Sequence, residues 1–417
     1  MAEVRDFSTY AGKFNSRKKA GASGRQTSYK EKIRSHKVAV FVRAVVISAF
    51  VITLATVIYV SWRDKHYSEA VTVEGVKIST ESDAKIVDLN GYIVQYSKDG
   101  ARCIDSSGKA VWDQTYEMQE PKACTCMNSI AIGDKSNGHE IYVSNTGGFL
   151  APIETDLPII DFCVSSQGVV AAVLDGVDVT WIYLYDSQGK VIAYFMTTMK
   201  DSGYPLDIGI SPNGELVCVS YLLPEDGQAM TKVAFYNFGE VGQNDSDNLV
   251  SGYNCPGEVV PEVEFMGGDK AFAVSDGRVI FFSGAQKPVA EKTDLLNDEE
   301  IISVFHNDSY VGLVFEEEAG EGKYRLQVYT SSGNKVLGKT GEKGVSTCYF
   351  DMDYSDIIFT NKQIVIYNDN EYMLMDMNGR VKYQGTFDEP VRTMIPTGAM
   401  NKFFVVTEDS IDTLLLK

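Results

Sequence analysis

Histidine and tryptophan are scarce in this chain of 417 residues, which contains four of the first and three of the second. Nucleophilic hydrolysis needs a positioned base, and histidine is the side chain that most often serves. His36 and His66 flank the long apolar run described below, and the Gly-x-Ser-x-Gly elbow of hydrolases is absent. His306 is expected in a hairpin turn rather than in a triad. The sequence therefore predicts no catalytic residues of this class.

Cysteine offers no disulfide framework. The seven cysteines are Cys103, Cys124, Cys126, Cys163, Cys218, Cys255 and Cys348. An odd number at irregular spacing is not typical of a disulfide-stapled protein. Cys124 and Cys126 form one close pair, but two thiols without a partner pair or a nearby histidine are weak evidence for a metal site. We predict that most of the seven are small buried apolar residues, and we expect neither a metal nor a cofactor.

Complete ligand-binding loops are also absent. The full calcium loop Asp-x-[Asp/Asn]-x-[Asp/Asn]-Gly does not occur, and neither does a phosphate loop or a dinucleotide fingerprint. Fragments of the calcium pattern occur at 134–138, 244–247 and 351–356, and we interpret each as a turn. Calcium binding stays an open question at this point.

Charge is missing from one long run. Residues 44–62 read AVVISAFVITLATVIYVSW and contain no charged side chain. A helix of this length is about 28 Å long, close to the thickness of the hydrocarbon core of a bilayer. Val38–Val42 extend the run, with Arg43 reaching the headgroups, so we predict a transmembrane helix over 38–62. A buried core helix is the alternative, but the basic flank and the lack of an amphipathic pattern disfavour it.

The charges are distributed unevenly about this run. Residues 1–43 hold eleven Lys/Arg against three Asp/Glu, whereas residues 64–417 carry a net charge of −28. Because basic flanks stay in the cytoplasm, we predict a disordered cytoplasmic segment over 1–37, a linker over 63–69 and an exported domain over 70–417. A cleaved signal peptide is the alternative, yet the long basic segment and the missing Ala-x-Ala site favour an uncleaved signal-anchor. The expected protein is a single-pass membrane protein that contacts lipid through 38–62 and, being acidic outside, binds no nucleic acid.

Beyond the apolar run, one hairpin recurs. It reads CIDSSGKAVW at 103–112, YLYDSQGKVIAYF at 183–195, VYTSSGNKVLGK at 328–339 and LMDMNGRVKYQG at 374–385. One glycine in each unit marks the period: Gly108, Gly148, Gly189, Gly239, Gly284, Gly333 and Gly379. The spacing of 40 to 50 residues, with about four strand-like runs in each unit, is typical of β-propeller blades. The sequence therefore predicts an all-β fold, a β-propeller on an N-terminal transmembrane helix.

The number of blades follows from the turns. Seven turns and an incomplete unit of three strands at 391–417 predict eight blades. The missing outer strand of the last blade can come from 70–79, which would remove two free sheet edges. Seven blades is the alternative, because the segment 238–258 is irregular.

Two turns resemble those of known propellers. CIDSSGKAVW resembles the quinoprotein-type repeat, whose turn reads Asp-x-x-Thr-Gly-Lys before a tryptophan, and IGISPNGELVCVSYL (208–222) resembles the Ser-Pro-Asp-Gly hairpin of WD40 proteins. The layout is also similar to an uncharacterised bacterial family of single-pass membrane proteins with a propeller-like exterior. The resemblance covers about 70–417 and implies a fold rather than an activity. Quinone enzymes also share a tryptophan in each blade and an adjacent cysteine pair, which this chain lacks, so quinone binding is not expected.

Acidic loops between second and third strands are the candidate binding residues. They contain Glu225 and Asp226 within 223–229, Glu316, Glu317 and Glu318 within 316–322, and Asp175 and Asp178. In a propeller such loops emerge on the same face as the connections between blades, where partners often bind. We expect a non-catalytic binding or scaffold module for an envelope protein or a wall polymer. The alternative is a hydrolase of envelope glycans that uses paired carboxylates.

Overall fold

The computed structural model describes residues 29–63, 67–78, 83–225, 227–244, 246–296, 299–317, 322–336, 347–360 and 362–417. The chain divides into two compact units, residues 1–65 and residues 66–417. The first unit contains one described helix, and the second contains all of the described strands. Each unit is considered separately below.

The first unit contains α1 (Tyr29–Arg63), and its stretch His36–Ile58 is long and apolar enough to cross a membrane. The side-chain hydroxyls of Thr53 and Thr56 donate hydrogen bonds to backbone carbonyls one turn earlier, so these two polar groups are satisfied within the helix. The helix begins at Tyr29, so residues 29–37 are helical where we expected disorder. Their lysines, arginine and isoleucine are good to fair helix formers, and an apolar helix already nucleated propagates through them at little cost. Residues 1–28 lie outside the described part of the chain.

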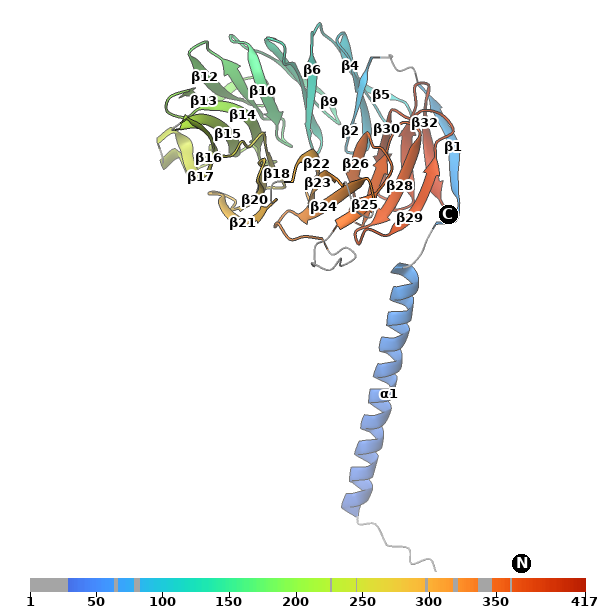
Figure 1. The fold of residues 1–417 in the computed structure, drawn as a ribbon. Coiled ribbons are helices and arrows are strands. Elements are labelled where there is room, and N and C mark those ends of the chain that lie inside the picture. Colours follow the sequence, from blue (N-terminus) through green and yellow to red (C-terminus); the bar gives the residue numbers. More distant parts are fainter. Residues whose placement is uncertain are drawn as a thin grey trace, which may run out of the picture. The chain divides into compact units, whose positions relative to one another are not determined.

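In the described residues of the second unit, the chain forms eight antiparallel sheets of four strands each (Figure 1). Blades 1 and 2 are β2 (Lys85–Leu89), β3 (Tyr92–Tyr96), β4 (Gly100–Ile104) and β5 (Ala110–Thr115), then β6 (Pro121–Cys126), β7 (Ser129–Asp134), β8 (Glu140–Asn145) and β9 (Gly148–Glu154). Blades 3 and 4 are β10 (Ile159–Val164), β11 (Val170–Asp175), β12 (Val179–Tyr185) and β13 (Val191–Thr198), then β14 (Tyr204–Ile210), β15 (Leu216–Glu225), β16 (Gln228–Asn237) and β17 (Leu249–Pro256). Two short 3₁₀ turns, η3 (Gly242–Asn244) and η4 (Ser246–Asn248), precede β17.

The remaining blades follow the same order. Blades 5 and 6 are β18 (Glu262–Phe265), β19 (Lys270–Val274), β20 (Arg278–Ser283) and β21 (Val289–Leu295), then β22 (Ile301–His306), β23 (Tyr310–Glu316), β24 (Tyr324–Thr330) and β25 (Thr347–Phe350). Blade 7 is β26 (Asp356–Phe359), β27 (Gln363–Tyr367), β28 (Glu371–Asp376) and β29 (Val381–Thr386). Blade 8 is β30 (Thr393–Pro396), β31 (Lys402–Val406), β32 (Ser410–Leu416) and β1 (Ala70–Lys77).

The last blade is closed by the first strand of the chain. β1 pairs antiparallel with β32, with Ala70 opposite Leu416 and Lys77 opposite Ser410. Figure 1 shows this blue strand beside the red strands of the C-terminal blade. The predicted closure by 70–79 and the predicted count of eight blades are therefore confirmed, and the seven-blade alternative is wrong.

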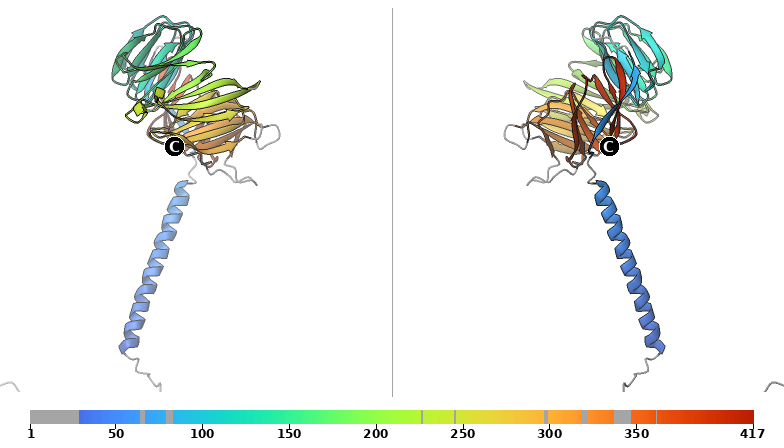
Figure 2. Two further views of the ribbon diagram at one scale, coloured as in Figure 1. Left: turned by 90° about the vertical axis from the view of Figure 1, so that its left-hand side faces the viewer. Right: turned by 90° about the vertical axis from the view of Figure 1, so that its right-hand side faces the viewer.

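The core is divided among the junctions between blades, which Figure 2 shows from two further sides. In the described residues each junction has its own cluster of buried apolar side chains. The junction of blades 4 and 5 buries thirteen residues, whereas the junction of blades 8 and 1 buries five. The five are Ile93, Ile104, Ile395, Val406 and Ile411. The junction that closes the ring is thus the smallest.

The recurring hairpin has a physical explanation. In blade 1 the Asp105 carboxylate accepts hydrogen bonds from the backbone N–H groups of Ser107 and Lys109, at 2.9 and 3.0 Å. Gly108 has a φ of 77°, which glycine adopts without strain. Six of the seven predicted glycines have positive φ, and the exception, Gly239, lies in the longer connection between β16 and β17. That connection is the irregular segment of the repeat.

The cysteines behave as small apolar residues. All seven are free, five are buried, and Cys124 and Cys126 are half-buried. Burial raises the pKa of both Cys124 and Cys126 to about 12, so neither is a thiolate at neutral pH. These thiols fill space between strands, as predicted.

Candidate functional site

The propeller has two faces with different loops. The hairpin face carries the turns from first to second and from third to fourth strands. The connection face carries the turns from second to third strands together with the links between blades. The predicted acidic loops therefore belong to the connection face, as the topology of a blade requires.

The structure places the predicted residues of blade 3 at the tip of a tight turn. Asp175 and Asp178 are both exposed and flank Gly176 and Val177. The Asp175 carboxylate accepts a hydrogen bond from the Val177 N–H at 3.0 Å, which holds the turn. The Asp178 carboxylate is available to a partner.

The predicted residues of blades 4 and 6 differ in setting. In blade 4 the pairing of β15 and β16 continues to Glu225 opposite Gln228, so 223–229 is a long hairpin and not a long loop. Gly227, with a φ of 81°, makes the two-residue turn possible. In blade 6 Glu316 ends β23, and an oxygen of Glu317 lies 3.2 Å from Nε of Arg325. Asp226 and Glu318 lie outside the described residues.

A larger acidic surface lies where the ring closes. Two adjoining cavities of about 520 and 510 Å³ lie over blades 7 and 8 and share Glu389, Val391, Thr407 and Asp409. Their carboxylates come from Glu74, Asp369, Asp388, Glu389, Glu408, Asp409 and Asp412, and their cations are Lys77 and Arg392. We call this surface the closure groove. Its lining carries seven negative and two positive charges, so it attracts cations.

Most of these carboxylates point to solvent. Asp388, Glu389, Glu408 and Asp409 are exposed at loop tips. Asp412 has a structural role instead, because it accepts hydrogen bonds from the Gly75 N–H at 2.8 Å and the Ser410 hydroxyl at 2.6 Å. It thereby fixes β1 to β32, and the exposed carboxylates around it are left for a ligand.

The first strands of blades 2 to 5, together with Lys135 just after β7, bring a second set of charges together near the axis. Nζ of Lys122 lies 2.5 Å from Asp161, and Nζ of Lys135 lies 3.2 Å from the other oxygen of the same carboxylate. Asp161 also accepts a hydrogen bond from the Phe162 N–H at 2.7 Å. The two lysines neutralise this buried carboxylate, which is the usual condition for keeping a charge in an interior.

The neighbouring carboxyl groups near the axis are protonated more easily than usual. Burial raises the pKa of Asp207 to about 6, of Glu262 to about 7 and of Glu264 to about 8. Each also lies within the field of at least one other carboxylate of the set, which favours the neutral form. A Cβ at Gly209 would lie 2.9 Å from Sγ of Cys218 and 3.2 Å from an oxygen of Glu264, so glycine makes room for both side chains.

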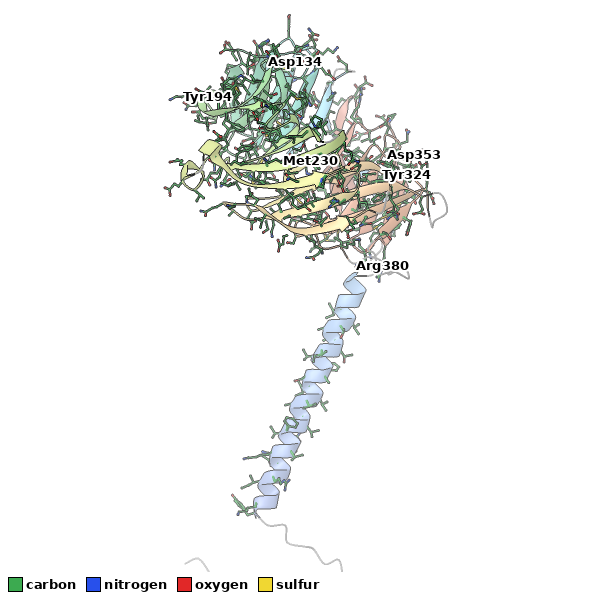
Figure 3. All side chains as sticks on the ribbon, turned by 60° about the vertical axis from the view of Figure 1, so that its left-hand side comes forward. Asp134, Tyr194, Met230, Tyr324, Asp353 and Arg380 are labelled. Carbon is green, nitrogen blue, oxygen red and sulfur yellow. The ribbon has the colours of Figure 1, made fainter. Side chains whose placement is uncertain are left out.

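Of the fragments of a calcium loop, the one at 134–138 caps a turn, the one at 351–356 binds neighbouring side chains, and the one at 244–247 lies partly outside the described residues. The Asp134 carboxylate accepts hydrogen bonds from the N–H groups of Gln119, Glu120 and Ser136. Asp353 is paired with Lys323 and with the hydroxyl of Tyr324, and Figure 3 labels two members of this group. Within the described ranges, no group of three or more His, Cys, Asp or Glu side chains is placed to hold a metal ion.

Together the fold and the faces define an eight-bladed β-propeller protein with an N-terminal apolar helix. Residues 63–416 match the family described as "Family of unknown function (DUF5711)", and the chain belongs to that family. No curated protein matches the chain.

Solved structures with a similar fold include the C-terminal WD40 domain of Sif2, at 13% identity and a TM-score of 0.52, covering 83% of this chain and 98% of that one. They also include BamB from Moraxella catarrhalis, at 11% identity and a TM-score of 0.43, covering 83% of this chain and 100% of that one. At such identities the likeness concerns the fold, and the similarity to the WD40 domain of Sif2 confirms the expected resemblance to WD40-type propellers.

Proposed function

We propose that this protein is a membrane-anchored, extracytoplasmic binding module that captures a basic partner on its connection face. The observation that supports the proposal is the closure groove, where exposed carboxylates from three loops and from β1 surround two adjoining cavities. A partner with clustered lysine or arginine residues, or a cationic wall polymer, complements that charge. The predicted acidic residues Asp175 and Asp178 extend the negative field on the same face.

The hydrolase alternative has less support. The axial carboxyls include Glu264, whose pKa is raised, and the carboxyl group of Asp161, and a glycosidase uses a pair of carboxyl groups. Asp161, however, is neutralised by two lysines. The cavities of the closure groove are lined by other residues. Binding without catalysis therefore explains more of the surface.

The membrane orientation leads to a first prediction. Single cysteines introduced as Ser16→Cys and Ser68→Cys should react differently with a membrane-impermeant maleimide in intact cells. Ser68→Cys should be labelled, and Ser16→Cys should be labelled only after permeabilisation, because the basic flank stays inside. The unsubstituted protein, whose cysteines are buried or half-buried, gives the background.

The reverse labelling pattern would refute this orientation. Loss of the N-terminal residues from the mature protein, seen by intact mass, would show a cleaved signal peptide in place of an anchor.

The closure groove leads to a second prediction. The triple substitution Asp388→Asn, Glu389→Gln and Asp409→Asn should weaken binding of an octalysine peptide by about tenfold or more, since it removes three exposed charges around one cavity. Binding is measured by fluorescence anisotropy at low salt, and the difference should shrink at high salt.

A matched control removes three charges from the hairpin face, with Glu215→Gln, Asp269→Asn and Asp308→Asn. This control should bind octalysine within about twofold of the parent, because those side chains are distant in the blade from the connection face. Equal weakening in both variants would mean that only net charge matters, and the groove would not be the binding site.

A further inference from the structure

Exposed apolar side chains are concentrated on blade 3. In the described part of the propeller, seventeen large apolar residues are exposed, and seven of them lie between residues 177 and 204. Five of the seven belong to blade 3, and the other two follow it, Met199 in the link to blade 4 and Tyr204 at the start of β14; the five are Val177, Val191, Ile192, Tyr194 and Met196. Figure 3 shows the labelled Tyr194 at the outer rim. A cluster of exposed apolar side chains is typical of an interaction surface, whereas single exposed apolar residues are common everywhere.

The outer strand of this blade, β13, has a bulge at Ile192 near its start, but from Ala193 to Thr198 it pairs regularly with β12 and leaves a free edge. It is the last strand of its sheet, in the order β10-β11-β12-β13. Its sequence VIAYFMTT spans eight residues without a charge, a proline or a glycine. Native proteins usually blunt a free edge with charged residues or proline, with a β-bulge, or by keeping the strand short.

The other outer strands are all blunted in this way. β5 has Asp113, β9 has Pro152, β17 has Gly252 and Pro256, β21 has Glu291, Lys292 and Asp294, β25 has four residues only, β29 has Lys382 and Gly385, and β1 has Glu74 and Gly75. β13 is therefore the exception among the described outer strands.

An aromatic row lies beside this edge. Tyr183 is opposite Tyr194, and Trp181 is opposite Met196, in the pairing of β12 with β13. The ring centroids of Tyr183 and Tyr194 are 5.2 Å apart, and those of Tyr183 and Tyr185 are 5.9 Å apart. Rigid aromatic surface of this kind offers contact area at little cost in side-chain entropy.

The opposite side of β13 is fixed. Phe195 and Ala193 pack against the cluster that joins blades 3 and 4. The ring of Phe195 lies 4.4 Å from that of Tyr236. The edge is thus held in an extended conformation and needs no rearrangement to accept another strand.

Charges indicate what kind of strand would fit. At the connection-face end of β13, Asp175, Asp178 and Asp201 are exposed, with Lys200 as the nearby cation. A basic residue on the incoming strand would complement them. A second copy of this chain fits poorly, because residues 64–417 carry a net charge of −28 and two copies would repel.

We propose that the edge of β13 docks an extended segment of another protein, which adds a fifth strand to blade 3. Its alternate apolar side chains pack on the row of Trp181, Tyr183, Tyr194 and Met196, and a basic residue lies beside Asp175 and Asp178. Backbone hydrogen bonds to β13 supply affinity, and the aromatic row selects the side chains. This surface is separate from the closure groove and does not depend on it.

The test uses the full-length protein in lipid nanodiscs and a panel of ten-residue peptides. Each peptide has valine, phenylalanine or tyrosine at alternate positions, threonine between them, and two lysines at one end or the other. We expect one or more peptides to bind and to slow amide hydrogen exchange at 191–198, because the new strand protects β13. The double variant Tyr194→Lys with Met196→Lys should weaken that binding by about tenfold or more.

The matched control is Val289→Lys with Leu295→Lys on β21, two residues exposed to a similar degree, which should leave binding within about twofold. Unchanged melting of both variants shows that they fold. The proposal is overturned if no peptide binds up to about 1 mM, if a peptide binds without protecting 191–198, or if both variants lose binding equally. Self-association that Tyr194→Lys with Met196→Lys abolishes would instead assign the edge to a second copy.

Discussion

A soluble form that begins at Lys85, and so lacks β1, should unfold at a lower temperature than one that begins at Tyr67, and it should aggregate. Removing β1 breaks the antiparallel ladder from Ala70 opposite Leu416 to Lys77 opposite Ser410. At about 1 kcal/mol net for each backbone hydrogen bond, the free energy of unfolding should fall by about 5 kcal/mol. The freed edge of β32 would then recruit other chains.

The burial of the side chains shows which residues account for the lower free energy of unfolding. Most side chains of β1 are exposed, including Val73 at 46%, so little apolar burial is lost with them. Removal of β1 mainly affects Leu414 and Leu416 of β32, which are almost fully buried. It also affects the smallest junction of the ring, because Ile78 packs against that cluster.

The measurement is a circular-dichroism melt with light scattering of both forms. Val73→Thr in the longer form is the control, and it should change the melting temperature little because that side chain is exposed. Equal melting temperatures and equal monomer fractions for the two forms would show that β1 does not hold the ring closed.

Much of this architecture was predictable because the determinants are local. Asp105, Asp186 and Asp376 each cap a tight turn through hydrogen bonds to the backbone two and four residues later. Because each blade needs the same turn, similar residues recur at that turn in these copies of the repeat. The blade count then followed from counting turns, and the incomplete last unit identified the strand that closes it.

Properties that depend on neighbours distant in the sequence were not predictable. The closure groove joins Glu74 with Asp369, Glu389 and Asp409, residues separated by about 300 positions, and no periodicity brings them together. The long hairpin of blade 4 was mistaken for a loop, because acidic residues are frequent in both. The alternation Glu262, Val263, Glu264 was the one local signal for two carboxyls on the same side of an inner strand.

Those inner-strand carboxyls should make the propeller more stable in mild acid than in mild base. The pKa of Glu264 is raised from 4.5 to about 8, that of Glu262 from 4.5 to about 7, and that of Asp207 from 3.8 to about 6, in each case mainly by burial. In this range the folded protein binds protons that the unfolded chain has released. The stabilisation is therefore complete below about pH 4 and is lost as the pH rises through 6 to 8.

The carboxylate of Asp134 acts at lower pH and in the opposite direction. Hydrogen bonds from backbone N–H groups hold the pKa of Asp134 below its usual value, despite partial burial. Its contribution to stability is present above its unfolded pKa of about 4 and is lost on acidification below that. Between pH 5 and pH 9 the buried cysteines, whose pKa values burial raises, and His306, whose pKa burial lowers, contribute as well. Substituting Glu264, which has the largest shift of the three axial carboxyls, therefore isolates its own part of the pH dependence.

Substitution of Glu264 by glutamine should therefore flatten the pH dependence. The Phe265 N–H donates a hydrogen bond of 2.9 Å to Glu264 in the parent protein, and the amide oxygen of Glu264→Gln can still accept it. The amide, however, has no proton to lose in this pH range. At pH 5 the variant should match the parent, and at pH 9 it should be more stable, by on the order of 3 kcal/mol. Urea unfolding at pH 5 and at pH 9 measures the difference.

The control is Glu408→Gln, at an exposed residue of the connection face, and it should keep the pH dependence of stability seen in the parent. If Glu264→Gln retains that dependence as well, the buried carboxyl does not set the pH dependence, and the charges near the axis are solvated in the folded protein.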